Sequence, residues 1–307
     1  MGNSFKTILK QTSKDFKNRS VNPPLVRTST MVFKSMSDLR QTQKKSLKNP
    51  RGGFFDYGRK GTSTTLELEK LLTKLEESYH TFLTPTGFGA VFLTLFSILR
   101  PGDELIIADP VYSPTRNLTE KYLKDFKILA KFYDPNDLST IKKNITKKTK
   151  LIYVENPGSN TFEFQDLGKI LSIAKSKKIY TAIDNTWGTP YFLKPIKLGF
   201  DLSIVSGTKY YSGHSDVMGG SLAVSQRVFS RVLQAHNMTG LRLSPDYAYL
   251  IMRGLITLDV RLDKHQENTN KIARFLSQKK ILKFYILSKK TRKIIIYGKS
   301  ITRVPQD

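Results

Sequence analysis

The chain has 307 residues, no cysteine, and 51 Lys and Arg against 25 Asp and Glu. Its 39% hydrophobic residues are enough to bury a core, which excludes an intrinsically disordered chain, and its length favours one large domain with additional pieces or two domains. The lack of cysteine excludes disulfides, thiolate metal sites and cysteine nucleophiles, and it is consistent with a reducing compartment.

The net charge of +26 raises the hypothesis of a basic nucleic-acid-binding protein. Residues 1–50 carry 11 Lys and Arg against 2 Asp and Glu, and residues 271–307 carry 11 against 1. The excess lies at the two ends, and no zinc-finger spacing or RNA-binding pattern accompanies it. We therefore expect no dedicated nucleic-acid partner.

We also expect a cytoplasmic protein without a membrane partner, because "AVFLTLFSIL" is too short to span a bilayer and no signal peptide is recognisable.

In chain order, residues 1–56 are predicted to form an N-terminal arm, because the first 50 are polar and basic with little periodicity. The leucines of "TSTTLELEKLLTKLEESY" recur at nearly helical spacing and predict a helix over 62–79. "TPTGFGA" then breaks the chain and opens a second helix, which Pro101 and Gly102 end.

From residue 104 onward, short apolar strands alternate with amphipathic helices. This pattern favours an α/β fold, with a mostly parallel central sheet covered by helices on both faces. Helical sequence returns over 247–276, as if the chain left the sheet for a second unit. The predicted strands are 104–109, 127–133, 150–156, 179–184 and 201–207, and the predicted helices between them are 113–126, 137–145 and 166–178.

Polar residues follow several of these strands directly. Tyr112 follows the first strand, Asp184 closes "IYTAID", and Ser206, Thr208 and Lys209 follow "DLSIV". Because ligands of open parallel sheets bind outside the carboxyl ends of the strands, we expect these residues to surround one site.

Gly87, Phe88 and Gly89 stand at the start of the second helix, where backbone N–H groups favour a phosphate. A phosphate site, a carboxylate and a lysine at one edge are what pyridoxal phosphate requires. Each piece alone has an ordinary reading: Lys209 as a solvated charge, Asp184 as a turn former, and the glycines as turn residues. Their combination, in order and at strand ends, favours the cofactor, and no metal site is expected because the four histidines lack metal-ligand spacing.

The same segments resemble a known family, the pyridoxal-phosphate enzymes of Cys/Met metabolism. "SGTKYYSGHSDVMGG" is similar to the family's lysine signature, "DNTWGTP" to its aspartate motif, "PTGFGA" to its phosphate loop, and "YGRKGTSTTLELEKLLTKLE" to its Tyr-x-Arg segment. "ENPGSNTFEFQDL" resembles the bacterial cystathionine β-lyases more than the γ-synthases. The resemblance implies an aspartate-aminotransferase-like (type I) fold and β-elimination of cystathionine to homocysteine, pyruvate and ammonia, in methionine biosynthesis.

The resemblance also implies a role for each matching residue. Lys209 would form the Schiff base and move protons, so it is predicted to be catalytic together with Tyr112, which would stack on the cofactor ring. Asp184 would bind the ring nitrogen. The phosphate would be held by Gly87, Phe88, Ser206 and Thr208, and by Tyr57 and Arg59 of a neighbouring subunit. A homo-oligomer, a dimer or the tetramer usual in the family, is therefore expected.

After about Leu276 the resemblance ends. We expect a large cofactor-binding domain over 57–250, followed over 251–307 by the start of a truncated or divergent C-terminal domain. The tail reads like translation out of frame, the alternative being a diverged small domain. The family's substrate-carboxylate arginine belongs to that domain. Arg292 and Arg303 are the only arginines after residue 280, and neither lies in a recognisable context, so neither is assigned to that role. A catalytically impaired member and a related γ-lyase or γ-synthase activity stay open as alternatives.

Overall fold

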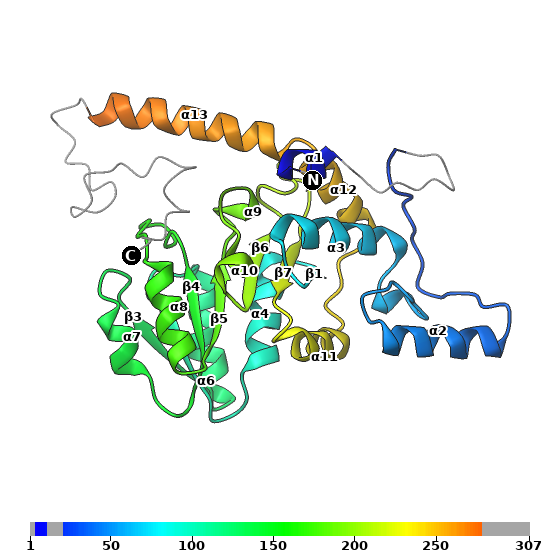
Figure 1. Ribbon diagram of the computed structural model, residues 1–307, viewed down its shortest axis with the longest axis horizontal. Coiled ribbons are helices and arrows are strands. Elements are labelled where there is room, and N and C mark those ends of the chain that lie inside the picture. The colour runs from blue at the N-terminus through cyan, green and yellow to red at the C-terminus, as the bar shows by residue number, and fades with distance from the viewer. Residues whose placement is uncertain (1–3, 11–20, 278–307) are drawn as a thin grey trace.

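The described part of the chain is built around one seven-stranded sheet. The computed structural model describes residues 4–10 and 21–277 (Figure 1). The strand order is β1-β7-β6-β5-β4-β2-β3. Strands β3, β2, β4, β5 and β6 run parallel to one another, and β7 runs antiparallel to both β6 and β1. The strands are β1 (His80–Thr84), β2 (Glu104–Ala108), β3 (Leu129–Tyr133), β4 (Thr149–Glu155), β5 (Tyr180–Asp184), β6 (Leu202–Ser206) and β7 (Gly220–Val224). The expected mostly parallel sheet is confirmed.

Helices cover both faces of the sheet. In β1 and β6, Leu83 and Val205 pack with the leucines of α3 (Ser63–Glu76), whereas Phe82 and Ile204 pack with α4 (Gly87–Ile98). Successive side chains of a strand point to opposite faces, so two neighbouring residues serve two separate layers of core. This double burial explains why the strands read as continuous apolar runs.

The predicted helices over 62–79 and 166–178 are confirmed as α3 and α8 (Leu167–Ser176). Thr62 caps α3, since its hydroxyl accepts the Thr65 N–H and the Thr65 hydroxyl accepts the Thr62 N–H. The helix expected over 113–126 consists of α5 (Ser113–Asn117), a π-helical turn η2 (Leu118–Tyr122) and α6 (Leu123–Asp125). The short helix α7 (Ser139–Asn144) also lies where it was expected.

Several elements were not anticipated. The strands β1 and β7 read "HTFLT" and "GSLAV", so threonine, serine, histidine and glycine interrupt the continuous apolar run by which the other strands were recognised. The N-terminal segment contains α1 (Phe5–Lys10) and α2 (Met36–Lys48), and none of the α2 residues is buried (Figure 1). A helix that buries none of its side chains needs no apolar stripe, which is the pattern by which sequence reveals a helix. The other elements that the sequence did not predict are α9 (Thr189–Phe192), α10 (Pro195–Leu198), α11 (Phe229–Thr239) and the 3-10 turn η1 (Gly58–Lys60).

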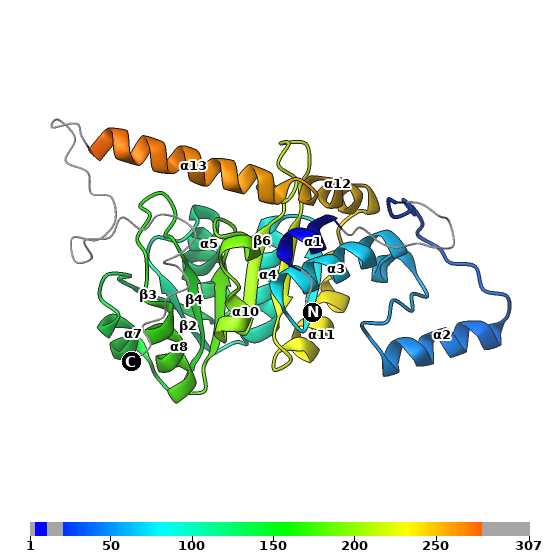
Figure 2. The ribbon, with the colours of Figure 1, turned by 45° about the horizontal axis from the view of Figure 1, so that its top comes forward.

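The described chain ends in two helices, α12 (Pro245–Leu255) and α13 (Leu258–Ser277), which confirm the helical stretch expected there. Figure 2 shows α13 running past the edge of the sheet. No helix within 4–10 or 21–277 combines the length and apolar character that crossing a bilayer requires. The domain limits stay predictions, and the tail over 278–307, with Arg292 and Arg303, lies outside the described residues.

Candidate active site

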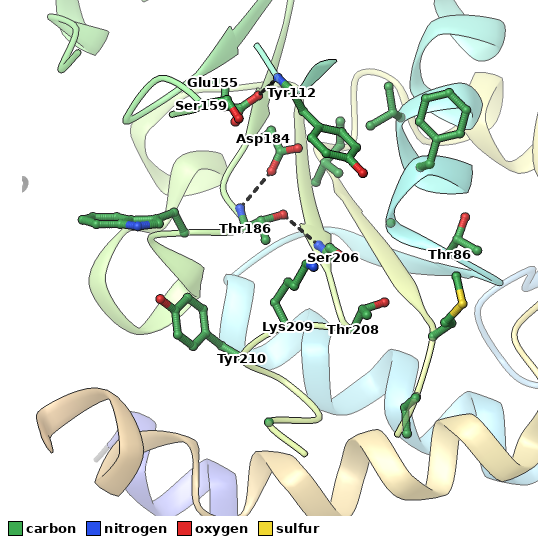
Figure 3. Close-up of a pocket in the computed structure, with 18 of the residues that line it drawn as sticks. Thr86, Tyr112, Glu155, Ser159, Asp184, Thr186, Ser206, Thr208, Lys209 and Tyr210 are labelled. Carbon is green, nitrogen blue, oxygen red and sulfur yellow. Dashed lines mark hydrogen bonds between the residues drawn. The ribbon is translucent and has the colours of Figure 1, made fainter. Parts of the chain in front are cut away.

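A cavity of about 1050 Å³ opens at the carboxyl ends of the parallel strands (Figure 3). Its size is at the upper end of ordinary small-molecule sites, enough for a cofactor together with a substrate. Seven of the nine residues predicted for the site line it: Gly87, Phe88, Tyr112, Asp184, Ser206, Thr208 and Lys209. The fold therefore brings residues more than 120 positions apart to one cavity, at the sheet edge where ligands of parallel sheets bind.

One end of the cavity is formed by the first turn of α4. The Thr86 hydroxyl caps this helix by accepting the Gly89 N–H at 2.8 Å. Within the described ranges, the N–H groups of Gly87 and Phe88 have no hydrogen-bond acceptor. A Cβ at Gly87 would lie 2.5 Å from Ser206 Oγ and 3.0 Å from Ser206 Cα, so only glycine allows α4 to approach β6 this closely. Two free N–H groups at a helix N-terminus beside a serine hydroxyl form a site for an anion.

The lysine loop begins where β6 ends. Thr186 Oγ1 accepts the Ser206 N–H at 2.9 Å, which fixes the end of the strand. The Thr208 hydroxyl is engaged by Gly219, to whose carbonyl oxygen it donates at 3.3 Å and from whose N–H it accepts at 3.1 Å. Lys209 Nζ forms no hydrogen bond or ion pair within the described part of the chain, and its side chain points into the cavity toward Ser206 (Figure 3).

Two carboxyl groups lie side by side across β4 and β5. Asp184 pairs in register with Glu155, and both line the cavity. Burial raises the pKa of Asp184, opposed by the hydrogen bond that its Oδ1 accepts from the Thr186 N–H at 3.0 Å. Burial and the neighbouring Asp184 charge raise the pKa of Glu155 to about 8. Glu155 was missed from the sequence, although it is the last residue of a predicted strand and the strand-end rule applies to it.

Tyr112 lies at one wall of the cavity, at the N-terminus of α5 (Figure 3). Its N–H donates to Glu155 Oε2 at 2.6 Å, which ties the start of α5 to the end of β4. Trp187, which follows Asp184 by three residues, also lines the cavity. Arg261 and His265 of α13 line it as well. They were missed because no strand-end rule applies to a helix that reaches the site only through the tertiary fold.

Tyr57 and Arg59 do not line this cavity. Tyr57 is 46% exposed and forms an isolated β-bridge with Thr30. The Arg59 guanidinium donates to the Asn237 carbonyl oxygen at 3.1 Å. These two predicted cofactor ligands therefore stand apart from the other seven within one copy of the chain.

Comparison with known proteins identifies the family. The Cys/Met metabolism PLP-dependent enzyme family matches residues 5–289. The chain belongs to this family. It is 36% identical to a putative cystathionine β-lyase of Rhizobium johnstonii over 83% of this chain and 62% of the relative. It is 33% identical to an L-methionine γ-lyase of Pseudomonas putida over 83% of this chain and 64% of the relative. The chain thus spans somewhat less than two thirds of the length of these relatives.

Solved structures of the family share the fold. A cystathionine γ-synthase from Xanthomonas oryzae pv. oryzae, solved with cystathionine, superimposes with a TM-score of 0.83 at 31% identity, covering 91% of this chain and 70% of that one. The expected aspartate-aminotransferase-like arrangement is thereby confirmed. Pyridoxal phosphate, on which the family depends, is the cofactor that membership indicates for this chain.

The cavity fits pyridoxal phosphate by the chemistry of its donors. The free N–H groups of α4 and the Ser206 hydroxyl suit a phosphate, and Lys209 supplies an amine for the aldehyde. The Asp184 carboxyl group lines the same cavity, and a carboxylate there suits a protonated ring nitrogen. One predicted ligand fits less directly, since the Thr208 hydroxyl would have to turn from Gly219 to reach a phosphate.

Proposed function

We propose that the chain is a carbon–sulfur lyase that uses pyridoxal phosphate to cleave cystathionine by β-elimination, giving homocysteine, pyruvate and ammonia in methionine biosynthesis. The observation that carries the proposal is the convergence of Lys209, Asp184 and the N-terminus of α4 on one cavity. The name of the Rhizobium relative, a putative cystathionine β-lyase, supports β-elimination as the reaction. The cytoplasmic location expected from the sequence stays a prediction.

Each residue has one task in this proposal. Lys209 Nζ would hold the cofactor aldehyde and, once the substrate amine has replaced it on that carbon, the freed amine would take the proton from the substrate Cα. Asp184 keeps the ring nitrogen protonated, and the N–H groups of Gly87 and Phe88 hold the phosphate with the Ser206 hydroxyl. When bound, pyridoxal phosphate supplies the electron sink that stabilises negative charge at the substrate Cα.

The positions of Tyr57 and Arg59 support a site shared between subunits. Neither lines the cavity of its own chain, and Tyr57 is half exposed. We propose that both contact the cofactor phosphate of a neighbouring copy, so that a dimer is the smallest active unit and a tetramer is two such dimers.

Two alternatives concern the reaction. The Pseudomonas relative is a γ-lyase and the Xanthomonas structure is a γ-synthase, so γ-elimination or γ-replacement is the second candidate. A catalytically impaired member is the third, because no described residue is assigned to bind the substrate α-carboxylate. A basic nucleic-acid-binding protein, suggested only by the charged ends, is the rival from another class of function.

The deciding experiment combines spectra with product analysis. Purified chain mixed with pyridoxal phosphate should give the absorption band of a cofactor joined to a lysine amine, and this band should be absent in Lys209→Ala. With cystathionine, β-elimination yields pyruvate, whereas γ-elimination yields 2-oxobutyrate. A band without either oxo acid would identify an impaired member. No band at all, with salt-sensitive DNA binding that survives deletion of both basic ends, would overturn the proposal in favour of nucleic-acid binding.

A further inference from the structure

The Tyr112 ring is placed in the cavity by its backbone alone. Its side chain is 48% exposed and makes no hydrogen bond or ring contact with another described residue, nor does it cap α5. The backbone, in contrast, is held on both sides. The Tyr112 N–H donates to Glu155 Oε2 at 2.6 Å, and its carbonyl oxygen accepts the Arg116 N–H at 3.0 Å. The position of the ring therefore depends on what holds residue 112.

Glu155 is a rigid anchor for that backbone. It ends β4, which lies between β2 and β5 in the sheet, and its own carbonyl oxygen accepts Gln165 Nε2 at 2.9 Å. Its carboxyl group also shares a hydrogen bond with Ser159. Figure 3 shows Glu155, Ser159 and the Tyr112 backbone together at one end of the cavity. One carboxyl group thus joins the sheet, the segment after β4 and the start of α5.

The surroundings of Glu155 favour the neutral acid. Asp184 stands beside it in register on β5, and no lysine or arginine of the described ranges forms an ion pair with it. The other titratable groups that face it are the Tyr153 phenol of β4, the Tyr112 phenol and Lys209 across the cavity. Burial and the Asp184 charge raise the pKa of Glu155 to about 8. Two hydrogen bonds oppose this shift, because the Tyr112 N–H and the Ser159 hydroxyl both favour the charged carboxylate.

We propose that Glu155 is a positioning residue of the site: its carboxyl group holds the Tyr112 backbone so that the Tyr112 ring forms a wall against the bound cofactor. The inference rests on the proposed function, because the wall has a purpose only if the cofactor binds. If the inference holds, glutamine at position 155 should preserve cofactor binding. Its amide oxygen can accept the Tyr112 N–H, and its amide nitrogen can donate to the Ser159 hydroxyl.

The first test titrates the apo chain with pyridoxal phosphate and records the dissociation constant and the visible circular dichroism of the bound cofactor. Glu155→Ala should raise the dissociation constant about tenfold and change the dichroism, whereas Glu155→Gln should stay within about threefold of wild type. Glu163→Ala removes a carboxylate from the same segment outside the cavity and should behave as wild type. Should Glu155→Ala fail to fold, Glu155→Met keeps the volume while removing both oxygens.

The second test asks whether Glu155 acts through Tyr112. In a Tyr112→Ala background, Glu155→Ala should change the dissociation constant by less than about twofold, because the ring it positions is gone. A full tenfold effect in that background, or equal effects of Glu155→Gln and Glu155→Ala, would overturn the inference. Failure of the wild-type chain to bind pyridoxal phosphate would instead count against the proposed function, so the two failures are distinguishable.

Discussion

The hydroxyl of Tyr211 donates a hydrogen bond of 3.3 Å to Oε1 of Glu76, which joins residues 135 positions apart. Glu76 is completely buried near the end of α3, where its other oxygen accepts the Ser203 hydroxyl at 3.4 Å. Tyr211 stands two residues after Lys209. The loop that carries the proposed catalytic amine is therefore attached to α3 through a buried carboxyl group.

The Glu76→Gln variant should differ from wild type in stability by an amount that depends on pH. Burial raises the pKa of Glu76 from 4.5 to about 8 in the folded chain. Between these values the folded chain holds a proton that the unfolded chain has released, so this group lowers the free energy of unfolding as pH rises. The slope is at most about 1.4 kcal/mol per pH unit. Because glutamine does not titrate, the variant should gain stability relative to wild type from about pH 5 to pH 8.

Urea denaturation at several pH values measures this difference directly. Glu67→Gln, on the same helix, is the matched control because Glu67 makes only an exposed pair with Lys70 at 2.9 Å. Its stability relative to wild type should change little across the series. Parallel stability curves for wild type and Glu76→Gln would contradict the assignment of a buried neutral acid.

Gly87→Ala should weaken cofactor binding by about tenfold or more, because the added methyl group would collide with both the side chain and the backbone of Ser206. Gly89→Ala is the matched control, since its Cβ would come no nearer than 3.3 Å to Thr86 Oγ1 and should cost less than about threefold. Titration of each apo variant with pyridoxal phosphate distinguishes them. Similar losses in both variants would mean that the first turn of α4 is not the phosphate site.

Mixing two inactive variants tests whether the site is shared between subunits. Lys209→Ala lacks the amine, and Arg59→Ala lacks a guanidinium proposed to act in the neighbouring site. In an equal mixture, half of the dimers contain one chain of each kind, and each of these has one complete site, so about a quarter of the wild-type cofactor spectrum and turnover should return. If dissociated and reassembled mixtures regain nothing, although each variant still forms dimers, Arg59 does not act across subunits.

Local sequence patterns predicted most of the parallel sheet. Strands such as 150–156 are short apolar runs bounded by polar turns, and they were recognisable because both faces of the sheet are covered. The polar residues after these strands also predicted five lining residues of the cavity, Lys209 and Asp184 among them, and the start of α4 predicted Gly87 and Phe88. The rule succeeds because the direction of parallel strands brings their carboxyl ends to one edge, whatever their order in the sheet.

The amino-acid sequence by itself therefore determined the five parallel strands, which edge carries the site and which cofactor chemistry the residues support. Only the tertiary structure decided that Glu155 stands beside Asp184, that Tyr211 bonds Glu76, that α13 brings Arg261 to the cavity and that Arg59 stays outside it. The physical reason is that strand order, register and helix packing are long-range properties. They are set by side chains burying one another across the whole chain, whereas hydrophobic periodicity reports only on neighbours within a turn or two.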